Sequence, residues 1–180
     1  MKAPRQLAAA TAAAIALGSL SCGTDDPPEA RPAESRFHAR GASVVIPHGW
    51  TATRRPTSTI LDPRTLFTAA SFDLDPVRPR SCSPTEVLRQ KPPDGALIVV
   101  SRYGRDHGRL SDIPRRPESF SLSAENRGSF ECSGRSYALH FREGGRGYGV
   151  NVWLDPRTAD PDTRREAEDL LDGMELTATD

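Results

Sequence analysis

Residues 136–154, SYALHFREGGRGYGVNVWL, decide the fold that this sequence predicts. Apolar side chains alternate with polar or small ones in both halves of the stretch: Tyr137, Leu139 and Phe141, then Tyr148, Val150, Val152 and Leu154. The intervening Glu143-Gly144-Gly145 supplies residues that accept positive φ in a tight turn. A period of two is typical of β-strands that bury one face. The stretch therefore predicts an antiparallel hairpin.

Four upstream segments have the composition of further strands. They are Ser43–Pro47 (SVVIP), Leu66–Leu74 (LFTAASFDL), Ala96–Tyr103 (ALIVVSRY) and the alternating pair Phe120 and Leu122. The run 97–100 is continuously apolar, which favours burial on both faces of a sheet. Together with the hairpin, these segments predict a mostly antiparallel sheet of about six strands.

Two helices are expected. Ser83-Pro84-Thr85-Glu86 has the pattern of a capping box, and Pro92-Pro93 ends the helix after about two turns. The second helix covers roughly 161–174, with Asp160 as its N-cap. Its apolar residues form one stripe at helical spacing: Ala167, Leu170, Leu171 and Met174. The fold class predicted is α+β, with the sheet packed by the short helix and the C-terminal amphipathic helix.

The N-terminus has the pattern of an export leader. Lys2 and Arg5 precede an apolar run of 11 residues, 7–17, and small residues follow. The run is too short to span a bilayer, which takes about 20 apolar residues. We expect a signal peptide over 1–21, a disordered tether over 22–35 and a single α+β domain over 36–180.

The three cysteines are Cys22, Cys82 and Cys132. Export places them in an oxidising compartment, where Cys82 and Cys132 are expected to form a structural disulfide. Closing about 50 residues stabilises a fold by roughly 4 kcal/mol in the chain-entropy treatment. The alternative, a redox-active pair, usually needs closer spacing.

Cys22 is then the odd cysteine, and two interpretations remain open for it. Acylation, with palmitate-type chains, would make it a lipid anchor at the start of the tether. Alternatively, Ser19 and Ser21 fit ordinary leader cleavage at the same bond.

The charge of the chain gives no electrostatic case for a nucleic-acid partner. Removing the leader takes away two of the 24 basic residues and none of the 24 acidic ones, which leaves a net charge of −2. The pairs Arg54-Arg55 and Arg115-Arg116 are short and scattered, so they do not predict a basic patch.

No catalytic, cofactor-binding or metal-binding residue is predicted. The four histidines, His38, His48, His107 and His140, have no metal-ligand spacing, and the chain contains no GxSxG elbow. Trp50 and Trp153 are the candidates for lining a ligand cleft, and a place in the core is the alternative for each.

The leader ending at Cys22, the polar tether, SVVIPHGW (43–50) and VNVWLDPRTADPDTRREAEDLLDGMEL (150–176) together resemble bacterial secreted lipoproteins of unassigned function. The entry SVVIPHGW and the closing helix are also similar to PsbP/Mog1-like domains. The resemblance implies an antiparallel sheet packed by helices that serves as an accessory or binding module, with no catalytic motif to transfer.

These features predict a non-enzymatic lipoprotein, anchored by lipid to the outer face of the cell membrane or another envelope membrane. Its domain is expected to bind an unidentified protein or small ligand. The alternatives are a structural component of the cell envelope and an enzyme with an unrecognised site.

Overall fold

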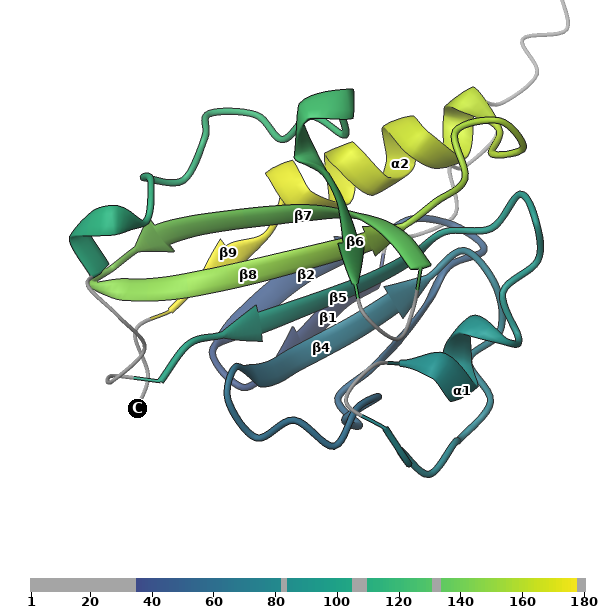
Figure 1. Ribbon diagram of the computed structural model, residues 1–180, viewed down its shortest axis with the longest axis horizontal. Coiled ribbons are helices and arrows are strands. Elements are labelled where there is room, and N and C mark those ends of the chain that lie inside the picture. Colours follow the sequence, from purple (N-terminus) through teal and green to yellow (C-terminus); the bar gives the residue numbers. More distant parts are fainter. Residues whose placement is uncertain (1–34, 82–83, 105–109, 131–133, 178–180) are drawn as a thin grey trace, which may run out of the picture. The chain divides into compact units, whose positions relative to one another are not determined.

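The computed structural model describes residues 35–81, 84–104, 110–130 and 134–177, which belong to one compact unit spanning Pro32–Asp180 (Figure 1). The expected leader, Cys22 and the Cys82–Cys132 disulfide lie outside the described residues. So does the expected tether, apart from Ser35, which is already the first residue of a strand.

The larger sheet has six strands, and every neighbouring pair in it is antiparallel. In spatial order the strands are β3 (Thr51–Thr53), β4 (Arg64–Ala70), β5 (Leu97–Arg102), β8 (Arg146–Trp153), β7 (Gly134–Glu143) and β6 (Arg127–Phe130). The mostly antiparallel sheet predicted from the sequence is confirmed.

β7 and β8 form the antiparallel hairpin that the sequence predicts. Glu143 pairs with Arg146, so the turn consists of Gly144 and Gly145 alone. Their φ angles are 55° and 74°, as a type I′ turn requires at both positions. Glycine carries no Cβ and adopts this conformation without strain.

A separate three-stranded sheet has the order β1 (Ser35–Ala39), β2 (Ala42–Ile46) and β9 (Glu175–Leu176). Only the β2 segment is predicted from the sequence. β1 is short and largely polar, and β9 has two residues, so neither carries a clear periodic signal.

The two α-helices are α1 (Thr85–Leu88) and α2 (Pro161–Asp172), and two 3-10 turns, η1 (Leu110–Asp112) and η2 (Ala124–Asn126), precede β6. α2 begins as predicted, because the Asp160 carboxylate accepts a hydrogen bond from the Asp162 N–H at 2.9 Å. α1 differs from the prediction: it is one turn long, and Pro84 is its N-cap. Glu86 is therefore the second helical residue, whereas a capping box needs it third.

The predicted strand at Phe120 and Leu122 is wrong. Both side chains are buried, but residues 117–123 pair with no strand. The backbone N–H of Phe120 donates to the Asp172 carboxylate at 2.6 Å, and that of Leu122 donates to Glu168 at 2.8 Å. The alternation arises because this segment is held against α2 by these two bonds, with Phe120 and Leu122 turned inward and Ser121 exposed.

The core forms two clusters on opposite faces of the six-stranded sheet. Alternate residues of β8 separate them: Val150 and Val152 belong to the larger cluster, and Trp153 belongs to the smaller one. The buried residues of α2 lie in the larger cluster, and Val87 of α1 lies in the smaller one. Figure 1 shows the two helices on opposite sides of the sheet.

Within the described ranges, no helix has the length and hydropathy needed to cross a membrane.

Candidate functional site

The two tryptophans predicted to line a cleft lie in separate places. Trp50 is 8% exposed and belongs to the larger core cluster, and its indole N–H donates to Glu166 Oε2 at 2.9 Å. Trp153 is 4% exposed and belongs to the smaller cluster. Trp50 lines a pocket of about 240 Å³, whereas Trp153 lines a different pocket of about 480 Å³.

The pocket at Trp153 gathers positive charge. We call it the basic pocket, and its polar lining consists of Lys91, Arg127, Arg135, Asp155, Arg157 and Thr158. These residues come from the α1–β5 connection, from β6, from the start of β7 and from the loop after β8. Four cationic side chains therefore surround one carboxylate.

Sheet register and a tight turn position the arginines. Arg127 pairs with Tyr137, and its guanidinium lies 5.5 Å from the centre of the tyrosine ring. Arg157 follows Asp155, whose carboxylate accepts the Arg157 backbone N–H at 3.0 Å. This local bond shapes the turn that carries the Arg157 side chain.

The loop after β8 is tied to the connection before β5. The Thr158 hydroxyl donates to the Pro93 carbonyl at 2.5 Å. On the same connection, Lys91 Nζ donates to the carbonyls of Pro92 and Gly95, each at 3.0 Å. Burial lowers the pKa of Lys91, and the carboxylates of Asp155 and Asp94 oppose that shift. The two segments of the basic pocket that lie outside β6 and β7 are thus fixed by hydrogen bonds.

Arg127, Arg135 and Arg157 have unused hydrogen-bonding capacity. Among the described residues, none of these guanidinium groups forms an ion pair or a hydrogen bond. A guanidinium presents five N–H donors in a planar fork that suits carboxylates and phosphates. The arrangement is therefore suited to binding an anion.

Sequence reasoning missed these three arginines. They are single residues spread over positions 127 to 157, without a spacing that marks a site. Only the antiparallel pairing of β6, β7 and β8 brings their segments to one end of the sheet.

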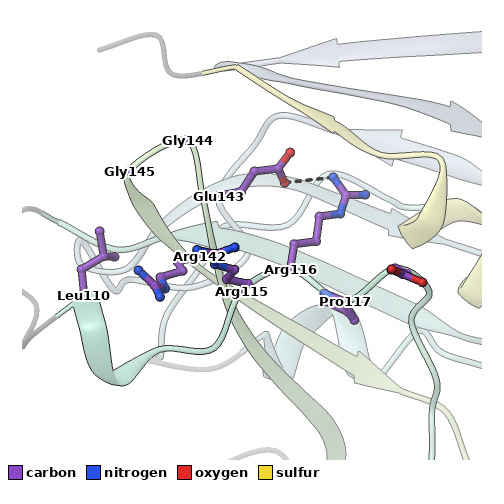
Figure 2. A pocket seen from close by; sticks show the side chains of 9 residues that line it. Leu110, Arg115, Arg116, Pro117, Arg142, Glu143, Gly144 and Gly145 are labelled. Carbon is purple, nitrogen blue, oxygen red and sulfur yellow. Dashed lines mark hydrogen bonds and ion pairs between the residues drawn. The ribbon is translucent and has the colours of Figure 1, made fainter.

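A third pocket, of about 430 Å³, lies at the β7–β8 turn (Figure 2). Within it, Arg116 forms an ion pair with Glu143 at 3.0 Å. Arg116 also donates to the carbonyls of Leu171 and Asp172, at 3.0 and 3.1 Å, and lies over the rings of two core phenylalanines. These contacts give Arg116 a structural role at the C-terminal end of α2.

The histidines do not form a site in the described structure. His38 and His48 are exposed, and His107 lies outside the described residues. His140 is exposed, and its Nδ1 lies 2.5 Å from the Tyr103 hydroxyl. Burial raises the pKa of Tyr103, and the negative charge of Asp62 adds to the shift. No group of three or more His, Cys, Asp or Glu side chains in the described part of the chain is placed to hold a metal ion.

Comparison with protein-family models, with curated proteins and with solved structures finds no match to this chain. The functional interpretation therefore depends on the sequence and on the geometry of the pockets.

Proposed function

We propose that the chain is a lipid-anchored extracytoplasmic lipoprotein whose domain binds an anionic ligand in the basic pocket without catalysing a reaction. The observation that carries the binding role is the gathering of Lys91, Arg127, Arg135 and Arg157 around one carboxylate beside Trp153. The volume of about 480 Å³ falls in the range of small-molecule sites. Shared core clusters support the α+β arrangement in which both helices pack on the sheet.

The anchor rests on the leader and on Cys22. β1 begins at Ser35, thirteen residues after Cys22, and such a stretch reaches at most about 40 Å. The domain would therefore work close to the membrane surface. Intact-mass analysis of the exported protein tests this part: we expect a chain that starts at Cys22 and carries acyl chains. An unmodified Cys22 would remove the anchor from the proposal.

A fluorescence titration tests the binding role. A Cys22→Ala chain can be purified without detergent, and Trp50→Phe in that background leaves Trp153 as the one tryptophan. Phenyl phosphate and benzoate serve as probes, because each joins an anionic group to a ring. We expect a saturable change in Trp153 fluorescence with one or both probes.

Arginine substitutions identify the pocket. Arg135→Gln and Arg157→Gln should each weaken binding by about tenfold, since a hydrogen bond to a charged group contributes roughly 1.5 kcal/mol or more. Arg55→Gln is the matched control, because Arg55 is exposed beyond the edge strand β3 and does not line the basic pocket. Equal affinities in all of these chains, or no saturable signal, would contradict the binding role.

A further inference from the structure

The pocket at the β7–β8 turn is lined by two arginines, Arg115 and Arg142, that take no part in the Arg116–Glu143 ion pair. Figure 2 shows the side chains of Arg115 and Arg142 close together, between Leu110 and the Arg116–Glu143 pair. Arg115 and Arg116 are adjacent in the sequence, and Arg142 comes from a strand 26 residues later. Their meeting is thus a product of the fold.

Backbone hydrogen bonds fix this juxtaposition. Arg115 and Arg142 form an isolated parallel bridge, which places the two residues next to each other. The Arg142 N–H donates to the Pro114 carbonyl at 2.7 Å, and the Arg116 N–H donates to the Arg142 carbonyl at 3.1 Å. β6 covers β7 only as far as Tyr137, so segment 114–116 pairs with the part of the β7 edge that β6 leaves open.

One of the two acidic residues in the lining already forms an ion pair. Glu143 pairs with Arg116, whose side chain is only 18% exposed and is held by the α2 carbonyls as well. Glu118, the other acid in the lining, is exposed and forms no ion pair in the described structure. The charges of Arg115 and Arg142 are therefore close together and not neutralised by a fixed partner, an arrangement that costs free energy through like-charge repulsion.

Arg142 also lacks a hydrogen-bond acceptor. Its Nε is buried and has no partner among the described residues, although guanidinium N–H groups are strong donors. Arg115 is exposed, and its side chain forms no hydrogen bond or ion pair with any described residue. Two guanidinium groups with spare donors therefore line one pocket, and each can present a planar fork of N–H donors that suits an oxyanion.

We infer that Arg115 and Arg142 form an oxyanion-binding site, separate from the basic pocket and independent of the function proposed for it. Arg135 in the basic pocket and Arg142 are seven residues apart on β7, which corresponds to about 24 Å. The ligand is a small molecule with a carboxylate or phosphate group, and Leu110 and Pro117 provide an apolar wall for its carbon part.

The test is a chemical-shift titration of arginine Nε–H signals in the full chain carrying Cys22→Ala. Arg142→Gln identifies the Arg142 signal by its loss. Inorganic phosphate and acetate are titrated separately at constant ionic strength, which distinguishes a phosphate ligand from a carboxylate. We expect a saturable shift of the Arg142 signal with at least one of the two anions.

Arg115→Gln should weaken that binding by about tenfold, because one of the two charged donors is lost. Arg115 is exposed, so the variant should keep its fold, and a thermal melt checks this. Arg55→Gln, which removes an equal charge elsewhere, should bind as the parent chain does. A shift that never saturates with either anion, or an unchanged affinity in Arg115→Gln, would overturn the assignment.

Discussion

The indole N–H of Trp50 donates to Glu166 Oε2 at 2.9 Å, which joins the turn after β2 to the middle of α2. The bond spans 116 residues of sequence, and it gives a tryptophan proposed for ligand binding a structural role. Trp50 is 8% exposed, so most of its side chain is shielded from water.

Glu166→Ala should lower the free energy of unfolding by about 1–2 kcal/mol, because it leaves the donor of a largely buried tryptophan without its acceptor. Glu166→Gln keeps an amide oxygen at the same position and should lose less than half as much. Urea denaturation of both variants measures the difference. If the two variants were equally stable, the hydrogen bond would not be what Glu166 contributes.

Arg116 should matter more to stability than its neighbour Arg115. Arg116→Met removes the ion pair to Glu143 and the bonds to the Leu171 and Asp172 carbonyls, and we expect a loss of about 2–3 kcal/mol. Arg115→Gln should stay within about 0.5 kcal/mol of the parent chain, because Arg115 is exposed. A melt of Arg116→Met that superimposes on that of Arg115→Gln would refute the structural role.

Leu170→Asp should prevent cooperative folding. Leu170 is 2% exposed in the core between α2 and the sheets. The substitution loses about 1.5–3 kcal/mol of apolar burial and adds the larger cost of burying a carboxylate, which together approach the stability of an ordinary domain. Asp169→Ala is the control, since Asp169 is exposed on the same helix. Circular dichroism melts compare the two, and a normal melt for Leu170→Asp would contradict this place for α2.

The β7–β8 hairpin and α2 could be predicted because each signal is local. The period of two, the Gly144-Gly145 turn and the apolar stripe with its Asp160 cap are all properties of short segments. The strands β1, β3 and β9 could not, because each is short, lacks an apolar run such as that of β2, and depends on pairing with a partner strand.

Phe120 and Leu122 show how a correct pattern can lead to a wrong element. Alternation indicates one buried face, and residues 120–122 have it: Phe120 and Leu122 are buried, and Ser121 between them is exposed. Their hydrogen-bond partners, however, are the carboxylates of Asp172 and Glu168 on a helix. The sequence likewise gives no indication that Arg115 and Arg142 are neighbours, because a backbone bridge between distant segments brings them together.

The three-stranded sheet β1-β2-β9 should contribute less to the stability of the fold in acid. Glu175 on β9 forms an ion pair with Arg36 of β1 at 2.9 Å and accepts a hydrogen bond from the Ser43 hydroxyl at 3.2 Å. These hydrogen bonds, with Arg36 the larger cause, hold the pKa of Glu175 below its ordinary value of 4.5. A lowered pKa means that the folded state binds the proton less readily than the unfolded state does. The contribution is therefore present above pH 4.5 and is lost as the pH falls through the pKa of the folded state.

Glu175→Gln tests this dependence. The variant should melt below the parent chain at pH 7, and the difference in melting temperature should narrow as the pH falls below 4.5 through the pKa of Glu175 in the folded state. Melting temperatures measured across this range make the comparison. A difference that stays constant over the whole acid range in which both chains still fold would exclude a role for the Glu175 charge.

The side chains of Tyr103 and His140 pack against Gly149. A methyl group added at Gly149 should therefore move the two side chains apart. A Cβ at Gly149 would stand 3.0 Å from the Tyr103 hydroxyl oxygen, closer than ordinary contact allows. Gly149→Ala should therefore displace the ring and lengthen the 2.5 Å contact between that hydroxyl and His140 Nδ1. The phenol stays protonated at neutral pH because burial raises the pKa of Tyr103, and we expect it to donate to Nδ1. His140 then carries its proton on Nε2.

Nitrogen NMR of the histidine ring reads that tautomer directly. The parent chain should show His140 with the proton on Nε2 at pH 8, and Gly149→Ala should show a mixture of tautomers. Gly128→Ala is the matched control on β6, because a Cβ there would meet only Ala138 at 3.9 Å. Should Gly149→Ala keep the single tautomer that Gly128→Ala shows, the close approach of Tyr103 to Gly149 would not be what fixes the histidine.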